Sequence, residues 1–353
     1  MNNNELKTIE DLIKKIVDNP NNSDNYLQLA NIYLKEGNND LAINVYESLL
    51  NFQPTNFLAL TNLANIYYYK ADYIKAINLY TRATGLELKN FSVYYNLGNA
   101  YAELGEFKQA MANYIKALNI DKNNYLVYSA IAMLYQDHKN YDEAIRYYEK
   151  ALSLNSSLPE NYTNLALVYM KKGVYNEASR LFQIASDMMP DNLKYILYCA
   201  NAYSAANKYL ESNALFEKLL KIDSTYYQAY ICYGISLYEQ SKIDMAIEIY
   251  EKAIQINPNL ANAYILLGNI YSSIQKYDDA VNSYKKAIEL KPADINAYIL
   301  SGNAYVMLKD LRSAISYYKQ AIDIEPDNDE LKLIYLEIVQ EFIMAREENQ
   351  NAA

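Results

Sequence analysis

The chain has 353 residues, of which 52% are hydrophobic and 13% aromatic, with only 8 glycines and 7 prolines; this excludes a disordered or collagen-like chain and argues against a loop-rich all-β protein. The formal net charge of -10 opposes binding to phosphate backbones or anionic membranes, so we expect no nucleic acid partner. Two cysteines and one histidine are too few for a disulfide framework, a zinc module or a histidine-based metal cluster.

The N-terminal segment is predicted to be a single amphipathic helix over residues 5–18, followed by Pro20. Charged residues are spread through the region where a secretory signal needs an apolar run, and no later stretch is long and apolar enough for a membrane helix. We therefore expect a cytoplasmic protein with no membrane insertion. Residues 1–22 are expected to form a half-repeat whose helix caps the N-terminal end.

A 34-residue repeat organises the chain from residue 23 to residue 328. The related segments NLANIY (62–67), NLGNAY (96–101), LLGNIY (266–271) and LSGNAY (300–305) begin at separations that are multiples of 34, which is the mark of a tandem repeat protein. Nine units fill this interval: 23–56, 57–90, 91–124, 125–158, 159–192, 193–226, 227–260, 261–294 and 295–328.

Each unit is predicted to contain two helices. Positions 4, 7, 8 and 11 of the unit follow the spacing of one helical face, and positions 20, 24 and 27 follow a second. Small residues at positions 8 and 20, as in Gly98 and Ala110, predict that the two helices approach closely. Glycine at position 15 and proline at position 32 mark the ends of the first and second helices. In the third unit the positions of these two faces hold Tyr94, Leu97, Gly98, Tyr101, Ala110, Tyr114 and Ala117.

This pattern resembles the tetratricopeptide repeat (TPR) family over residues 23–328. The resemblance implies an all-α fold, a right-handed α-α superhelix of helix-turn-helix repeats with capping helices at its ends. It also implies that the first helices line a concave groove, into which positions 2, 5, 6, 9, 12 and 13 point.

Asparagine recurs at the positions that the resemblance places in the groove. A carboxamide offers one acceptor and two donors, so a row of them can pair with the backbone of an extended peptide. The row is similar to the asparagine ladder in the TPR superhelix of O-linked N-acetylglucosamine transferase, which holds bound peptide backbone. The alternative is that the row reflects the asparagine-rich composition of the chain and the common descent of its repeats. The predicted row consists of Asn31, Asn62, Asn65, Asn96, Asn99, Asn164, Asn201, Asn269 and Asn303.

Tyrosine and aliphatic residues complete the predicted groove. Of the 40 tyrosines, 27 fall on positions 4, 11, 17 and 24, where they are expected to pack between helices. Five others are expected to project into the groove: Tyr68, Tyr69, Tyr95, Tyr198 and Tyr238. Towards the C-terminal end, positions 5 and 6 form an apolar lane suited to a hydrophobic segment or an amphipathic helix, with helix-helix contact as the alternative. Its residues are Ile231, Ile265, Leu266, Ile299 and Leu300.

The sixth unit departs most from the repeat pattern. It has Ile196, Cys199, Ser212 and Leu219 at positions 4, 7, 20 and 27. We expect looser packing there, which would make this unit a hinge in the array.

No residue of the chain is predicted to be catalytic. His138 lies in the inter-helix turn QDHKNY and Cys199 on a packing position, and neither has an evident catalytic neighbour. No glycine-rich phosphate loop is present. We predict neither a metal site nor a cofactor, and we expect the protein not to be an enzyme.

Residues 329–346 are predicted to form a last helix that caps the C-terminal end, followed by a polar tail over 347–353. One stripe of this helix holds Leu331, Ile334, Tyr335, Ile338 and Phe342. A second apolar line, Leu333, Leu336 and Ile343, indicates either imperfect capping or a surface for a partner or for a homo-oligomer.

The sequence as a whole favours a non-catalytic protein-protein interaction scaffold. We expect it to bind extended or helical peptide segments of a protein partner, whose identity the sequence does not reveal, in the concave groove. One alternative is a recognition subunit that acts with a separate enzyme such as a glycosyltransferase. Another is a scaffold that self-assembles through residues 329–346.

Overall fold

The computed structural model describes residues 3–86 and 89–351, with side chains described over 6–86 and 89–345, and within these ranges it contains twenty α-helices and no strand. The all-α prediction is thereby confirmed. The chain divides into two compact units, unit 1 (Met1–Val174) and unit 2 (Tyr175–Ala353). Unit 1 holds α1 (Asn3–Asp18), α2 (Ser23–Lys35), α3 (Asn39–Phe52), α4 (Phe57–Tyr69), α5 (Tyr73–Thr84), α6 (Phe91–Glu103), α7 (Phe107–Ile120), α8 (Tyr125–Asp137), α9 (Tyr141–Leu154) and α10 (Pro159–Lys171).

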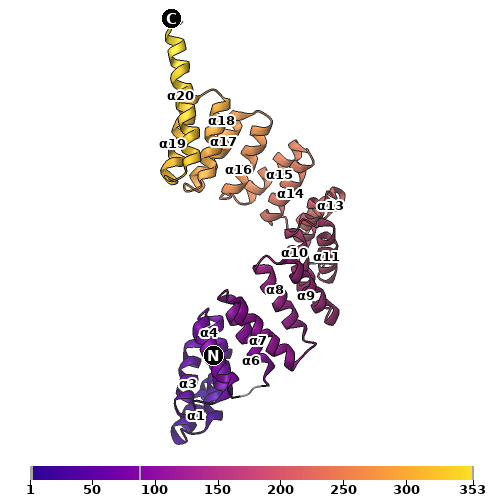
Figure 1. Cartoon of the computed structure of the whole chain (residues 1–353), viewed down its shortest axis with the longest axis vertical. Coiled ribbons are helices and arrows are strands. Elements are labelled where there is room, and N and C mark those ends of the chain that lie inside the picture. Colours follow the sequence, from indigo (N-terminus) through magenta and orange to yellow (C-terminus); the bar gives the residue numbers. More distant parts are fainter. Residues whose placement is uncertain (1–2, 87–88, 352–353) are drawn as a thin grey trace. The chain divides into compact units, whose positions relative to one another are not determined.

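Unit 2 continues with ten further helices. They are α11 (Tyr175–Met188), α12 (Leu193–Ala205), α13 (Tyr209–Ile222), α14 (Tyr227–Glu239), α15 (Ile243–Ile256), α16 (Ala261–Ser273), α17 (Tyr277–Leu290), α18 (Ile295–Met307), α19 (Leu311–Ile324) and α20 (Asp329–Asn351). Within each unit, helices adjacent in the chain pack on one another, as α6 and α7 do in unit 1 and α16 and α17 in unit 2 (Figure 1). The division of the chain into nine repeats stays a prediction.

Asparagine and aspartate begin many of the helices. The side-chain oxygen of Asn56 accepts a hydrogen bond from the Ala59 backbone N–H at 3.0 Å, and that of Asn90 accepts one from Val93 at 3.2 Å. Such a cap satisfies an N–H group that has no partner inside the helix. Part of the asparagine content of the chain therefore serves helix initiation.

A ring from the second helix fills the space between the two helices of each predicted repeat. The nine residues at position 24 are seven tyrosines, Phe182 and Phe216, and none is more than 2% exposed. The tyrosines lie beside a small residue at position 8 where that residue is glycine: a Cβ atom added to Gly98 would lie 2.6 Å from the Tyr114 ring, and one added to Gly268 would lie 2.5 Å from Tyr284. The predicted close approach at position 8 is thus a contact between glycine and an aromatic ring.

The sixth predicted repeat is packed tightly, so the expected hinge is not supported by its burial. Ile196, Cys199, Ser212 and Leu219 are each 0% exposed. The Ser212 hydroxyl donates to the Ala200 backbone oxygen at 2.9 Å, which satisfies the polar group in the core. The boundary between the two compact units falls elsewhere, between Val174 and Tyr175.

The first helix of every predicted repeat is followed by a residue with positive φ at position 15. Three are glycines, and six are other residues: Ala71, Lys139, Asn207, Ser241, Gln275 and Lys309, with φ between 58° and 62°. A left-handed conformation is sterically unfavourable for a residue that has a Cβ atom. Glycine at position 15 was expected from the sequence, but the repeat imposes the same backbone on whatever residue stands there.

Replacing Lys139, Gln275 or Lys309 by glycine is expected to raise the free energy of unfolding by about 1 kcal/mol each, because glycine removes the Cβ clash at positive φ. Urea titration followed by helical ellipticity measures the change. Gly173→Ala, at φ 74°, is the converse control and is expected to lose a similar amount. If all three glycine variants have a lower free energy of unfolding than the natural chain, this account of the turn is contradicted.

The two terminal helices cover the ends of their units. On α1, Ile9 and Leu12 are buried in a cluster with Leu29 of α2. On α20, Leu331 and Ile338 pack in a cluster with Tyr318 of α19. Helix α20 continues to Asn351, five residues past the predicted end at 346 and into the segment expected to be a polar tail.

Candidate functional site

The asparagines at position 9 receive a hydrogen bond from the buried tyrosine of their own predicted repeat. Each tyrosine hydroxyl donates to the Oδ1 atom of the asparagine fifteen residues before it. A buried hydroxyl needs such a partner, since an unpaired polar group in the core is unfavourable. The pairs are Tyr46 with Asn31 (3.0 Å), Tyr80 with Asn65 (2.5 Å), Tyr114 with Asn99 (2.8 Å), Tyr284 with Asn269 (2.9 Å) and Tyr318 with Asn303.

Two asparagines at position 6 extend this network between neighbouring predicted repeats of unit 1. Asn62 Nδ2 donates to the Tyr46 hydroxyl at 3.1 Å, and Asn96 Nδ2 donates to Asn65 Oδ1 at 3.1 Å. The Oδ1 atoms of these five position-9 asparagines therefore each accept a hydrogen bond inside the protein, and that of Asn65 accepts two. Their side-chain N–H groups remain as donors for a ligand.

The other predicted repeats depart from this pairing. Met133 and Ile235 hold position 9 where position 24 is Tyr148 and Tyr250. The Tyr148 hydroxyl donates instead to Gln136 Oε1 at 3.3 Å.

Leu167 holds position 9 where position 24 is Phe182, so neither residue of that pair is polar. Asn201 stands where position 24 is Phe216, and its Nδ2 donates instead to Cys232 Sγ at 3.6 Å. The joint occurrence of asparagine at position 9 with tyrosine at position 24 was present in the sequence and could have predicted these hydrogen bonds. The row has a structural role, whether or not it also contacts a peptide.

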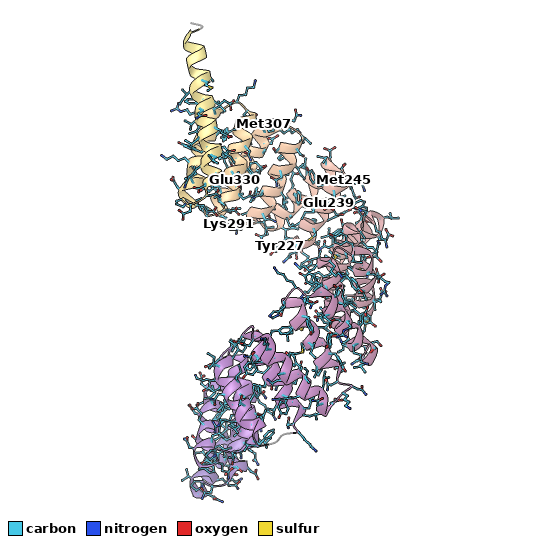
Figure 2. All side chains as sticks on the ribbon, in the orientation of Figure 1. Tyr227, Glu239, Met245, Lys291, Met307 and Glu330 are labelled. Atoms are coloured by element: carbon cyan, nitrogen blue, oxygen red, sulfur yellow. The ribbon has the colours of Figure 1, made fainter. Side chains whose placement is uncertain are left out.

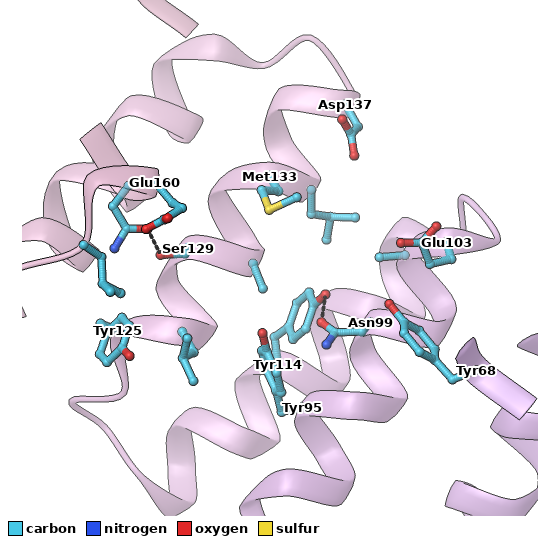
Figure 3. Close-up of a pocket in the computed structure, with 16 residues that line it drawn as sticks. Tyr68, Tyr95, Asn99, Glu103, Tyr114, Tyr125, Ser129, Met133, Asp137 and Glu160 are labelled. Atoms are coloured by element: carbon cyan, nitrogen blue, oxygen red, sulfur yellow. Dashed lines mark hydrogen bonds between the residues drawn. The ribbon is translucent and has the colours of Figure 1, made fainter. Parts of the chain in front are cut away.

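Unit 1 contains a cavity of about 630 Å³ that opens among its first helices, α4, α6, α8 and α10 (Figure 3). Three of the predicted groove residues, Tyr68, Tyr95 and Asn99, line it together. The lining is completed by Tyr114 of α7 and by residues of three first helices and the turn before α10: Ala102, Glu103, Tyr125, Leu126, Ser129, Ala130, Met133, Leu134, Asp137, Leu158, Glu160 and Asn161. The sequence did not indicate the residues contributed by α8 and α10.

Burial disfavours ionisation of two tyrosines of this cavity, Tyr68 and Tyr114. Burial, reinforced by the negative charge of Glu103, raises the pKa of Tyr68 to about 12. Burial also raises the pKa of Tyr114, whose ring lies 6.2 Å from that of Tyr95. The Tyr73 hydroxyl donates to Glu103 Oε2 at 3.4 Å and so helps to orient that carboxylate.

Asn161 is a buried amide on the cavity wall. Its side chain is 5% exposed, and its Oδ1 accepts a hydrogen bond from the Ser129 hydroxyl at 2.8 Å. Its Nδ2 is buried and has no hydrogen-bond partner among the described residues. Leaving such a donor unpaired costs about 1–3 kcal/mol, and because the nitrogen atom itself is buried, it is not exposed to a ligand in the cavity.

The remaining predicted groove residues of unit 1 do not line this cavity. Tyr69 is 84% exposed, and its ring contacts that of Tyr68 edge-on at 5.6 Å. Asn31, Asn62, Asn65, Asn96 and Asn164 lie outside the set of lining residues. The structure therefore places the candidate site of this unit among α4, α6, α8 and α10.

In unit 2 the predicted apolar lane is largely part of the packing between helices. Ile265 is 8% exposed and lies in a buried cluster with Ala287 and Ala297. Ile231 and Leu266 pack against one buried cluster, and Ile299 and Leu300 against others. Ile265 thus lies in the core, where it packs with Ala287 of α17 and Ala297 of α18. More exposed apolar side chains of this unit lie elsewhere, such as Met245 (47%) and Met307 (56%) (Figure 2).

The cysteines and the histidine sit in structural surroundings. Cys199 is 0% exposed, and burial raises the pKa of its thiol to about 12, so it is a poor nucleophile. Burial also raises the pKa of Cys232. His138 Nδ1 lies 2.9 Å from the Leu134 backbone oxygen, and its ring lies 4.7 Å from that of Phe107.

Two further searches of the described residues were negative. They contain no group of three or more His, Cys, Asp or Glu side chains placed to hold a metal ion. None of the described helices has the length and apolar character needed to span a membrane.

Similar solved structures include a tetratricopeptide repeat protein from Parabacteroides merdae, at 22% identity and a TM-score of 0.50, over 75% of this chain and 99% of that chain. Yeast Tom70 is similar at 16% identity and a TM-score of 0.52, over 98% of this chain and 86% of its own. MamA is similar at 25% identity and a TM-score of 0.43, over 48% of this chain and 93% of its own. The first two similarities support the helical-repeat fold. No curated protein matches the chain.

Family sequence patterns match the chain in both units. The pattern described as TPR repeat matches residues 30–70, 64–105, 134–173, 234–275 and 268–309, which together are more than half of the chain. Patterns described as tetratricopeptide repeat match residues 91–124 and 295–328. The repeat spacing, the paired helices and these matches agree, and the chain belongs to the tetratricopeptide repeat family.

Proposed function

We propose that the chain is a non-catalytic scaffold that binds an extended segment of a partner protein in the cavity of unit 1. Tetratricopeptide repeat proteins are protein-interaction scaffolds. The observation that carries the proposal is the cavity of about 630 Å³ among the first helices, which brings Tyr68, Tyr95 and Asn99 together. A concave site with a few polar groups that converge on it is the usual form of a binding pocket.

The hydrogen-bonding groups of the cavity suit a peptide backbone. Asn99 Oδ1 accepts a hydrogen bond from the Tyr114 hydroxyl, and the amide nitrogen of Asn99 supplies two N–H donors. Backbone carbonyl groups of an extended segment supply the matching acceptors, and they do so without regard to side-chain identity. The proposed role of the Asn99 amide is therefore to orient the segment.

The test replaces the hydrogen-bonded pair Asn99 and Tyr114 by a pair of apolar residues, leucine and phenylalanine. The fifth predicted repeat already has this apolar pair, Leu167 with Phe182. Peptides of twelve residues are selected from a displayed library on the intact chain, and their affinities are measured by fluorescence anisotropy. Asn99→Leu with Tyr114→Phe removes the amide without leaving a buried hydroxyl unpaired. We expect roughly fivefold weaker binding, the value of about one hydrogen bond.

The matched control is the same exchange in unit 2, Asn269→Leu with Tyr284→Phe, whose hydrogen bond is equivalent at 2.9 Å. It lies outside the cavity and is expected to leave affinity unchanged. If no peptide of the displayed library binds the intact chain, the proposed function is refuted. Equal affinities for both exchanged chains and the natural chain would remove Asn99 from the site.

The C-terminal helix carries a second candidate function, self-association. On α20 the side chains of Leu333 (62% exposed), Leu336 (52%), Ile343 (49%) and Met344 (62%) are open to solvent. An exposed apolar line of this kind is unfavourable unless it is covered. Light scattering over a range of concentrations measures the mass; a mass that stays at that of one chain removes this candidate.

A further inference from the structure

The wall of the unit 1 cavity changes from polar to apolar between α6 and α8. At position 9 of the predicted repeats, α6 contributes Asn99 to the wall and α8 contributes Met133. Leu126 lies two helical turns before Met133 on the same face of α8, and it also lines the cavity. Leu126 is 40% exposed and Met133 is 50% exposed, so α8 presents an accessible apolar surface inside the cavity.

The space over α8 is open because the residues between these two apolar side chains are short. They are Ser129 and Ala130, at positions 5 and 6 of the predicted repeat. Helix α6 has the larger Tyr95 at position 5. The Ser129 hydroxyl already donates to Asn161 Oδ1 at 2.8 Å, so it does not require a polar ligand. An apolar group can therefore enter this space without leaving the hydroxyl unpaired.

Tyrosine rings stand beside this apolar surface. Tyr95 of α6 and Tyr125 of α8 line the cavity together with Met133 (Figure 3). The Tyr95 ring packs against two other rings, since its centre lies 5.9 Å from that of Phe91 and 6.2 Å from that of Tyr114. Aromatic rings attract one another in offset and edge-to-face arrangements, and the methionine thioether also contacts rings favourably. These surroundings favour an aromatic occupant over an aliphatic one.

We propose that this part of the cavity is a specificity pocket for one aromatic side chain of the bound segment, with Leu126, Met133, Tyr95 and Tyr125 as its walls. The inference rests on the proposed function and specifies the partner, an extended segment with an aromatic residue close to the backbone carbonyl that Asn99 binds. Met133 is then the position at which the cavity changes from recognising backbone to recognising a side chain.

The protein variant for the test is Met133→Asn. It gives the fourth predicted repeat the asparagine–tyrosine pair that five other predicted repeats have, because Tyr148 already holds position 24. The control is Ile235→Asn, the same change at position 9 in unit 2, where Tyr250 holds position 24, and it lies outside the cavity. Ile235 is 39% exposed, close to the value for Met133. Helical ellipticity verifies that both variants are folded.

The peptide is the tightest binder selected from the displayed library, in its natural form and with each aromatic residue replaced in turn by leucine and by alanine. We expect the selected peptides to share an aromatic residue. At that residue, alanine should weaken binding to the natural chain about tenfold and leucine about threefold. Met133→Asn is expected to reduce the effect of alanine to about threefold, because the pocket has lost one apolar wall, whereas Ile235→Asn should keep the tenfold difference.

The outcomes distinguish this pocket from the proposed function. If the library yields no binder, the proposed function fails. If the binders share no aromatic residue, or if alanine weakens binding equally in the natural chain and in Met133→Asn, the function stands and the pocket is refuted. Equal affinities of the leucine and aromatic peptides for the natural chain would overturn the aromatic assignment. That comparison needs no protein variant, so it decides the assignment even if Met133→Asn does not fold.

Discussion

Replacing Tyr114 by alanine is expected to lower the free energy of unfolding of unit 1 by about 4 kcal/mol, the loss typical of a fully buried aromatic ring. The ring is 2% exposed, lies against Gly98 and donates its hydroxyl to Asn99. Its removal leaves a cavity between α6 and α7 and an unpaired carboxamide oxygen. Urea denaturation followed by helical ellipticity measures the change.

Two controls separate the sources of that loss. Tyr114→Phe keeps the ring and removes only the hydroxyl, so we expect a loss of about 1 kcal/mol. Tyr69→Ala removes a ring that is 84% exposed and is expected to have almost no effect. Because repeats in such arrays contact mainly their neighbours, the loss should be confined to unit 1. A Tyr114→Ala variant as stable as Tyr69→Ala would contradict the packing described for position 24.

Raising the pH above 10 is expected to unfold the protein cooperatively. Burial raises the pKa of Tyr284 to about 12 and raises the pKa values of Tyr80, Tyr148 and Tyr250. An unfolded tyrosine has a pKa near 10, so below pH 10 both states are protonated and the stability is complete. Between pH 10 and 12 only the unfolded chain loses these protons, and the free energy of unfolding falls by about 1.4 kcal/mol per pH unit for each buried phenol.

The alkaline transition can be followed by two signals at once. Absorbance at 295 nm reports phenol ionisation, and ellipticity at 222 nm reports helix content; we expect the buried tyrosines to ionise together with the loss of helix. Tyr250→Phe removes one buried phenol and should move the transition to higher pH. Phenylalanine is tolerated at this repeat position, because Phe182 and Phe216 already occupy it. Complete ionisation near pH 10 with the helices intact would contradict the burial of these rings.

The helical architecture could be predicted because it depends on a local pattern repeated many times. Small residues at position 8 predicted a close approach of the two helices, and the structure places Gly98 against the Tyr114 ring. The positive φ of Gln275 and Lys309 could not be read from those residues. The neighbouring helices fix the backbone of the turn there and override the preference of the side chain.

The candidate site was predictable only in part. The resemblance to the TPR family placed Tyr68, Tyr95 and Asn99 on the groove face, and they line one cavity. The repeat pattern does not show which side-chain atoms hydrogen-bond within the protein, so the bond from the Tyr114 hydroxyl to Asn99 Oδ1 was not predicted. The burial of Asn161 depends on how α8 and α10 pack, which is a tertiary property.

The central claim is that the first-helix face of unit 1 holds a peptide segment, and photo-crosslinking tests it most directly. A library-selected peptide carrying a benzophenone group is irradiated with the intact chain, and the attachment site is found by mass spectrometry. Met133 lines the cavity and is 50% exposed, and methionine is a favoured target of benzophenone. The account predicts attachment at Met133 and its neighbours on α8, α6 and α10. Attachment confined to α7, α9 or the helices of unit 2 would contradict it.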